Sequence, residues 1–274
     1  MKGIVISALA VLLVTSAFAT GISDNFQGYA PGIFPSPTWL DAGTVFPPAT
    51  QTFPSAFVVS TADAFGIPTQ ALALRDEVDP SRGIYATVPV SATYSLAADI
   101  RVDRYSDKPD STASDWAMQL TFAEAGVDNF ASTPQAGIYA SSQTGGWRLF
   151  LIANSTSADI DLGQDATIGT WYTVQLDFDV LSSKFHSIIK NTATGSTLVD
   201  RFDTISGLTL ADTQYNSIAF FGGEVSPDST IADQAVVDNV NISAVGSVPE
   251  PGSLAMLASG LLGTLAIRRR TRRG

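Results

Sequence analysis

Apolar and polar residues alternate one by one along several stretches of this chain. Successive side chains of a β-strand point to opposite faces, so alternation is typical of strands that bury one face and expose the other. Helical periodicity is scarce by comparison. The pattern therefore predicts an all-β fold. The inward-facing sets are Tyr94, Leu96, Ala98, Ile100 and Val102; Trp116, Met118, Leu120 and Phe122; and Tyr172, Val174, Leu176 and Phe178.

Turn-forming residues punctuate these stretches at short intervals. They include Asp79-Pro80, residues 108–110, 144–146 and 194–196, which combine Pro, Gly, Asp and Thr. Short strands joined by frequent turns favour two packed antiparallel sheets over a βαβ arrangement. With 45% hydrophobic residues the chain can fill a sizeable core. We expect one β-sandwich of roughly twelve to fourteen strands.

The composition excludes several kinds of site. The chain has no cysteine and a single histidine, His186, so disulfides, thiolate metal sites and multi-histidine metal sites are ruled out. Six of the 15 basic residues are Lys2 and five C-terminal arginines, whereas all 26 acidic residues except Glu250 lie in the body. Residues 21–248 therefore carry a net charge of −16. Such a body repels phosphate backbones, which argues against nucleic acid as a partner.

The first residues have the layout of a secretory signal. Lys2 precedes an apolar stretch from Ile4 to Val14, and small residues follow at Ala17 and Ala19. This pattern predicts a signal peptide over residues 1–19 that is cut after Ala19. An uncleaved anchor is the alternative, although the apolar stretch is shorter than the roughly 20 residues that a membrane span needs.

The last residues combine two prolines, an apolar segment and five arginines. The apolar residues from Leu254 to Ile267, extended back to Val248, are about long enough to cross a thin bilayer. Positive charge stays on the cytoplasmic side, so the body is expected outside the inner membrane. The prolines prevent a helix from extending backward through Glu250. The membrane-stop residues are Arg268, Arg269, Arg270, Arg272 and Arg273.

The order of these features resembles the PEP-CTERM sorting signal of Gram-negative bacteria. Pro249, Glu250 and Pro251 occupy the signature positions, and Thr271 interrupts the arginines as a mild departure. The resemblance implies processing by an exosortase and delivery to the cell surface or an exopolysaccharide matrix. An ordinary C-terminal membrane anchor is the alternative. The expected organisation is a signal peptide at 1–19, a β-sandwich domain at 20–246 and the sorting signal at 247–274, with its transmembrane helix.

A second resemblance concerns the fold of the body. Residues 168–202 contain a Gly-x-Trp-Tyr that opens a strand, followed by a hairpin and a Thr-Gly turn. This looks like the second half of concanavalin A-like and laminin-G-like jelly rolls. The resemblance implies a jelly-roll β-sandwich, but lectins, binding modules and glycosidases share that fold, so it does not decide function.

A pair of aspartates suggests a metal site. Asp24 shares a predicted strand face with Ile22 and Phe26, and Asp238 shares one with Val236, Val240 and Ile242. A carboxylate in an apolar row needs a partner or a cation. The first and last strands of jelly rolls commonly lie side by side, and oxygen ligands suit Ca²⁺. We predict a structural calcium ion at Asp24 and Asp238, with Asn25 or Asn239 carbonyls as further ligands. The alternative is that both acids lie in water or accept backbone hydrogen bonds.

Tryptophans suggest a carbohydrate-binding face. Trp147 follows a Gly-Gly turn and Trp171 belongs to a polar strand face, so these two are the candidates for stacking against sugar rings. Packing in the core is the alternative for both.

Catalytic patterns are weak in this sequence. Asp177 and Asp179 share a strand face about 7 Å apart, a spacing that a glycosidase could use, but solvated charge explains them equally well. His186 has no nucleophile elbow nearby and is expected to be structural. We therefore predict a secreted, non-enzymatic binding or scaffolding protein with polysaccharide as a partner. The alternative is a glycan-active hydrolase or lyase on the same fold.

Overall fold

The computed structural model describes only part of the 274-residue chain. The chain divides into a unit of residues 20–248 and a second unit formed by residues 1–19 and 249–274. All described residues belong to the first unit. They are residues 21–41, 56–76, 83–87, 93–104, 115–123, 135–143, 146–154, 164–179, 181–204, 217–222 and 233–245.

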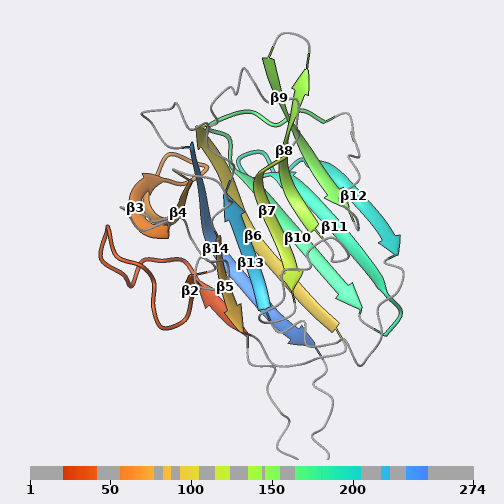
Figure 1. Cartoon of the computed structure of the whole chain (residues 1–274), viewed down its shortest axis with the longest axis horizontal. Helices are drawn as coiled ribbons and strands as arrows, with labels where there is room; N and C mark the ends of the chain where they lie inside the picture. The colour runs from red at the N-terminus through yellow and green to blue at the C-terminus, as the bar shows by residue number, and fades with distance from the viewer. Residues whose placement is uncertain are drawn as a thin grey trace, which may run out of the picture. The chain divides into compact units, whose positions relative to one another are not determined.

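The larger of two antiparallel sheets has eight strands. Its order is β12-β11-β10-β6-β14-β4-β3 (Figure 1), and β1 also pairs with β14. The strands are β1 (Ile22–Asp24), β3 (Ala56–Ala62), β4 (Pro68–Asp76), β6 (Thr93–Arg104), β10 (Tyr172–Asp179), β11 (Lys184–Asn191), β12 (Thr197–Thr204) and β14 (Asp233–Val245).

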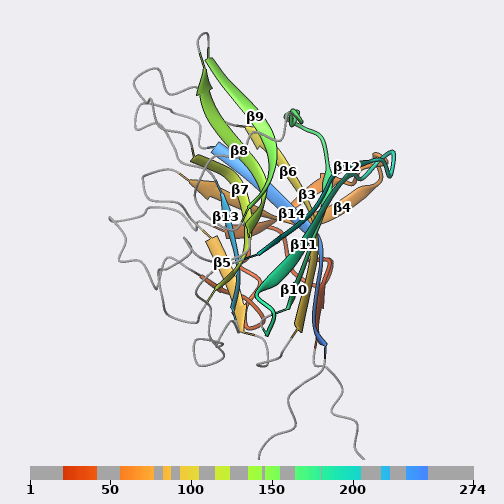
Figure 2. The ribbon, with the colours of Figure 1, turned by 90° about the vertical axis from the view of Figure 1, so that its right-hand side faces the viewer.

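The smaller sheet has six strands in the order β2-β5-β13-β7-β8-β9. Figure 2 shows the two sheets as two layers that face each other. The predicted all-β sandwich is therefore confirmed, and its fourteen described strands agree with the expected number. The strands of this sheet are β2 (Leu40–Asp41), β5 (Gly83–Thr87), β7 (Asp115–Ala123), β8 (Gln135–Gln143), β9 (Gly146–Asn154) and β13 (Ser217–Gly222).

One hydrophobic core lies between the sheets. The predicted inward faces of β6 and β10 are confirmed, because every second residue from Tyr94 to Val102 and from Tyr172 to Phe178 is buried there. In β7 a register shift between Trp116 and Met118 interrupts the alternation, and Ala117 joins the core. Leu120, Ile138 and Leu151 fill the core from the smaller sheet.

The last strand, β14, lies in the middle of the larger sheet. It pairs with β6 on one side, and its other side pairs with β4 over Asp233–Val237 and with β1 over Val240–Ile242. The first and last strands of the body are therefore neighbours, as the sequence predicted. Gly21, just before β1, also lies against the backbone of Ile242.

β1, and not the end of the β3–β4 hairpin, pairs with the second half of β14. β4 pairs with β14 only through Leu72–Asp76, but it continues to pair with β3 as far as Pro68 and Ala62. β14 and β4 separate β3 from β6 in the sheet order. Yet Arg101 of β6 donates hydrogen bonds to Thr61 and Ala62. Residues 60–70, called the overlying hairpin below, therefore fold across the outer face of the larger sheet.

A β-bulge in β14 reverses which face its side chains take. Asp238 pairs with Asp99 and Asn241 pairs with Ala97, so Asn239 and Val240 together stand opposite one residue of β6. Asn239 has a φ of 50°. The prediction that Asp238 shares one face with Val236, Val240 and Ile242 is therefore wrong. Val236 and Asp238 lie on the outer face, whereas Val240 and Ile242 lie in the core.

Replacing Gly21 by alanine is expected to lower the free energy of unfolding by about 1–3 kcal/mol, because overpacking is destabilising. The added Cβ would lie 2.6 Å from the carbonyl oxygen of Ile242. Gly28→Ala is the matched control, since no atom lies within 4 Å of its Cβ position. Urea denaturation of both variants measures the difference. Mass spectrometry checks that both variants begin at the same N-terminal residue. Equal effects of the two substitutions would show that β1 does not approach β14 this closely.

Among the described residues, no helix has the length and apolar character that crossing a membrane requires. The predicted signal peptide and the predicted C-terminal transmembrane segment both lie outside those residues.

Candidate functional site

The carboxylate of Asp24 is held by three neutral donors. Its Oδ1 accepts a hydrogen bond from the backbone N of Phe26 at 2.8 Å, and its Oδ2 accepts from Tyr29 Oη at 3.1 Å and Trp39 Nε1 at 2.9 Å. Phe26 and Trp39 are fully buried. Burial and the charge of Asp24 raise the pKa of the Tyr29 phenol. Asp24 therefore fixes the loop after β1 against the core.

Asp238 is a buried acid that faces two other acids. It is 3% exposed, and its bonds come from Asn239 N at 2.7 Å and Thr69 Oγ1 at 3.4 Å. Burial raises the pKa of Asp238 to about 6, and the charges of Asp99 and Asp24 add to the shift, whereas the two hydrogen bonds oppose it. The structure therefore brings Asp24 and Asp238 near enough for their charges to interact, with Asp99 as a third member.

Each oxygen of these three acids accepts at least one hydrogen bond. Asp99 accepts from Thr173 Oγ1 at 2.5 Å and from Asn239 Nδ2 at 2.9 Å, one bond to each oxygen. Both oxygens of Asp24 and of Asp238 also accept bonds, so a cation would share these oxygens with hydrogen-bond donors. Among the residues that the structure describes, no group of three or more acidic or histidine side chains is arranged to hold a metal ion. The described residues do not form a calcium cage, and calcium binding stays a prediction.

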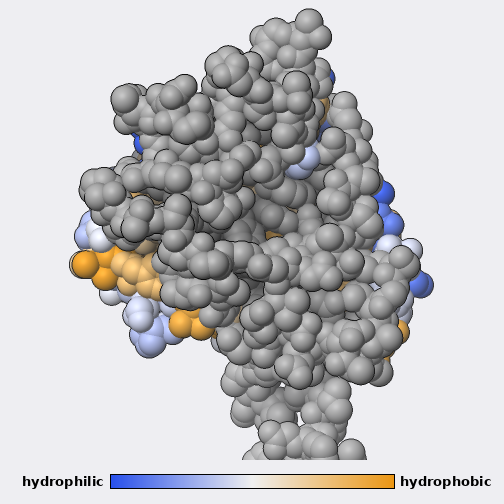
Figure 3. All heavy atoms as spheres, viewed as in Figure 1, coloured by the Kyte–Doolittle hydropathy of each residue, from blue (hydrophilic) through white to orange (hydrophobic). Residues whose placement is uncertain are grey.

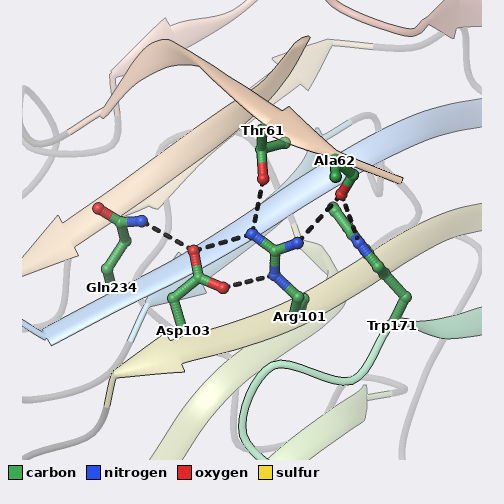
Figure 4. Close-up of polar contacts among 6 residues, drawn as sticks. All are labelled: Thr61, Ala62, Arg101, Asp103, Trp171 and Gln234. Atoms are coloured by element: carbon green, nitrogen blue, oxygen red, sulfur yellow. Dashed lines mark hydrogen bonds and ion pairs between the residues drawn. The ribbon is translucent and has the colours of Figure 1, made fainter. Parts of the chain in front are cut away.

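Trp171 lies on the outer face of the larger sheet, as predicted, but it is only 5% exposed. Its Nε1 donates to the carbonyl oxygen of Ala62 at 2.9 Å, and the Arg101 guanidinium carbon lies 4.6 Å from its ring centroid. Arg101 also donates to Ala62 O at 3.1 Å and to Thr61 Oγ1 at 2.8 Å (Figure 4). Trp171 and Arg101 thus fasten the overlying hairpin, and a sugar ring has little access to the indole.

A second set of contacts orients Arg101. Its Nε and Nη2 pair with the two oxygens of Asp103, the Nη2 contact being 3.0 Å long, and Gln234 Nε2 donates to Asp103 Oδ2 at 2.9 Å (Figure 4). The bidentate ion pair leaves the guanidinium plane with little freedom. It therefore helps to hold Arg101 between Trp171 and the overlying hairpin.

The other predicted site residues lie apart from this region or outside the described residues. Trp147 lies in β9, the last strand of the smaller sheet, opposite Ser142. The sorting residues Pro249, Glu250 and Pro251 and the five membrane-stop arginines lie outside the described residues.

The two aspartates considered for catalysis make structural contacts. Asp177 accepts hydrogen bonds from Ser95 Oγ at 2.6 Å and Gln175 Nε2 at 2.8 Å. Asp179 accepts bonds from the backbone N of Leu181 and from both N and Oγ of Ser182, which lower its pKa. Asp179 therefore stays ionised and stabilises the turn after β10.

The sequence interpretation missed an exposed aromatic cluster on β11 and β12. His186 stacks on Phe202 with ring centroids 3.8 Å apart and planes 7° apart. Asp200 lies 2.7 Å from His186 Nε2. Phe202 is 75% exposed. The alternation of this strand could have revealed the cluster. Val199 faces inward, so every second residue from Asp200 faces outward, which puts Phe202 on the polar face.

Exposed apolar side chains also occur near the opposite edge of the larger sheet. Ile33, Phe65 and Ile67 are all more than half exposed, and Phe65 and Ile67 belong to the overlying hairpin. In Figure 3 hydrophobic residues gather along the left side of the view, and hydrophilic residues lie along the right side, where Figure 1 places β12. The two edges of this sheet therefore differ in polarity.

Comparison with known proteins identifies the C-terminal signal. The PEP-CTERM protein-sorting motif matches residues 247–270, which confirms the predicted sorting signal. No curated protein sequence matches the chain.

Solved structures resemble the body at low sequence identity. Peanut lectin matches with a TM-score of 0.48 and 10% identity, covering 82% of this chain and 98% of the lectin. Arcelin-5, a lectin-like defence protein from Phaseolus vulgaris, matches with a TM-score of 0.43 and 10% identity, covering 83% and 98%. A sialidase matches with a TM-score of 0.40 and 11% identity, covering 69% of this chain, which spans only 17% of that protein. The assignment of a two-sheet sandwich rests on the strand order above.

Proposed function

We propose that this chain is an exported, exosortase-sorted protein of the surface or extracellular matrix of a Gram-negative bacterium. Its β-sandwich would be a non-catalytic binding and scaffolding body, with polysaccharide as its partner. The observation that carries the proposal is the PEP-CTERM motif at residues 247–270. The motif supports an exosortase as the processing partner, and we propose that the chain lies in the inner membrane before it is processed.

The contacts of Asp177 and Asp179, the two acids considered for catalysis, support a binding role over a catalytic one. A glycosidase needs a carboxylic acid that is protonated near neutral pH. Hydrogen bonds lower the pKa of Asp179, so it is a poor proton donor. Asp177, its neighbour on the same face, is bonded to Ser95 and Gln175. A hydrolase or lyase is the competing proposal, and release of reducing sugars from polysaccharide by the purified chain would favour it.

The negative charge of the body disfavours partners that are themselves negatively charged. A net charge of −16 over residues 21–248 repels nucleic acids and acidic polymers. A polymer without negative charge avoids this repulsion and can donate hydroxyl groups to the carboxylates. The proposed partner is therefore a neutral polysaccharide.

The predicted calcium ion would strengthen the body rather than take part in binding. Asp24 and Asp238 would hold it at acceptor positions that their present hydrogen bonds leave open. The ion would supply positive charge between acids that otherwise repel each other. A calcium-dependent rise in the midpoint of thermal unfolding, absent in EDTA, is the expected sign of such a site.

Replacing Pro249, Glu250 and Pro251 together by alanine is expected to block sorting, because the sorting enzyme then lacks its signature residues. In the native host the wild-type chain should reach the surface with a new C-terminus close to this motif. The variant should keep its uncut C-terminus and remain in the membrane fraction. Its amount in the matrix fraction should be at least about tenfold lower than that of the wild type. Mass spectrometry of both fractions measures this.

The matched control for sorting is Ser247→Ala, which lies inside the matched region but outside the signature. It should be processed as the wild type is. A host without exosortase should reproduce the triple variant's result with the unmodified chain. Normal processing of the triple variant, or of the wild type in that host, would refute the proposed sorting.

A further inference from the structure

A line of side chains crosses the outer face of the larger sheet from its β12 edge. Strand pairing places one residue of each of five neighbouring strands directly opposite the next. Neighbouring strands lie about 4.8 Å apart, so the line is about 19 Å long. We call it the outer-face row, and its members are Phe202 of β12, His186 of β11, Asp177 of β10, Ser95 of β6 and Ser243 of β14.

The β12 end of the outer-face row is a rigid aromatic plate. Phe202 stacks face to face on His186, whose Nε2 lies 2.7 Å from Asp200 Oδ1. The stack and the polar contact fix both rings, while Phe202 remains 75% exposed. An aromatic ring that is fixed before binding loses little conformational entropy when a ligand covers it. The free surface of Phe202 suits the apolar C–H face of a sugar ring.

The rest of the outer-face row offers mainly hydrogen-bond acceptors. Asp177 is held in place by bonds from Ser95 Oγ at 2.6 Å and from Gln175 Nε2 at 2.8 Å. A carboxylate has about four acceptor positions, so two further donors can reach it. Ser95 and Ser243 are small side chains, which allow a ligand to approach the sheet. Acceptors and negative charge together select a ligand that carries hydroxyl donors and no anionic groups.

We infer that the outer-face row is the polysaccharide-binding site of this protein. A neutral polysaccharide chain lies across the strands, with one sugar ring stacked on the free face of Phe202 at the β12 edge and with hydroxyl groups of other sugars along the chain donating to Asp177. This inference rests on the proposed binding function and assigns it to residues that the sequence interpretation did not select. Trp171, one of the two sequence candidates, is buried under Arg101 and the overlying hairpin.

The test uses the full-length chain, purified in mild detergent, in native gels that contain a polysaccharide. Hydroxyethylcellulose, galactomannan and dextran are the neutral probes, and alginate is the anionic probe. We expect the wild type to be retarded by at least one neutral polymer and not by alginate. Phe202→Ala should weaken that retardation at least about tenfold, because removal of the one aromatic stacking contact of a binding site typically costs this much or more. Asp177→Asn should weaken it less, since an amide oxygen still accepts hydrogen bonds.

Phe65→Ala is the matched control, because Phe65 is 67% exposed but belongs to the overlying hairpin. It should be retarded as strongly as the wild type. If Phe202→Ala and Phe65→Ala both bind like the wild type, the assigned site is wrong and the binding function stands. If no neutral polymer retards the wild type, the proposed binding function and the site both fail. Retardation by alginate alone would overturn the selection for neutral chains.

Discussion

Replacing Trp171 by alanine is expected to lower the free energy of unfolding by about 3–5 kcal/mol, the usual cost of removing a buried tryptophan side chain. Trp171 is 5% exposed and packs on a small apolar cluster with Ala71, Ala73 and Val236. It also donates a hydrogen bond to Ala62. The substitution therefore leaves a cavity beneath the overlying hairpin and removes one of the hydrogen bonds that attach it. Urea denaturation followed by circular dichroism measures the loss.

Two further variants separate packing from the hydrogen bond. Trp171→Phe keeps most of the apolar contact and should cost only about 1–2 kcal/mol, because it mainly loses one hydrogen bond. Phe202→Ala removes an exposed ring and should change stability by less than about 0.5 kcal/mol. Amide exchange in residues 60–67 should accelerate in Trp171→Ala. An unchanged free energy of unfolding with lost polysaccharide binding would instead make Trp171 a ligand-binding residue.

Replacing Asp238 by asparagine is expected to stabilise the protein at pH 8 by up to about 3 kcal/mol. Each unit of pKa shift corresponds to about 1.4 kcal/mol, and the folded-state pKa of about 6 lies above the ordinary 3.8. In the wild type the raised pKa means that the folded state binds the proton of Asp238 more tightly than the unfolded state does. The stability that this proton gives the wild type is fully present below about pH 4 and is lost as the pH rises through about 6. Asparagine is neutral throughout. Urea denaturation from pH 4 to pH 8 should show the largest gain at the alkaline end.

The control for Asp238→Asn is Asp165→Asn, which removes an exposed acid paired with Arg148. The Arg148 Nη2 to Asp165 Oδ1 distance is 2.5 Å, but both side chains are largely exposed, so the substitution should change stability by less than about 1 kcal/mol. Measurements in EDTA and in calcium test the predicted ion as well. A calcium-binding wild type would gain stability in calcium and Asp238→Asn would not. A loss of stability at pH 8 in EDTA would contradict the repulsion between these acids.

Alternation in the sequence was sufficient to predict the sandwich and the inward faces of β6 and β10. Each of these strands keeps a strict two-residue period, and the two strands pair with each other without a register shift. The neighbouring positions of the first and last strands were also predicted correctly. These features depend on local pattern and on the common topology of sandwiches, so a single sequence contains them.

Features that depend on strand register could not be predicted in this way. The bulge at Asn239 adds one residue to β14 and moves Asp238 away from the face of Val240, although no glycine or proline marks the place. The burial of Trp171 depends on a hairpin more than 100 residues earlier in the chain. The meeting of Asp238 with Asp99 likewise requires knowledge of which strands pair. Long-range pairing decides all three outcomes.

The central position of β14 sets an order of events during folding. β14 is the last strand of the body, and it joins the β12-β11-β10-β6 half of the larger sheet to the β4-β3 half and to β1. Until residues 233–245 are available to pair, these parts of the sheet have no strand to unite them, and the edges of β6 and β4 that face β14 stay open. The larger sheet is therefore completed only by the last strand of the body to be synthesised.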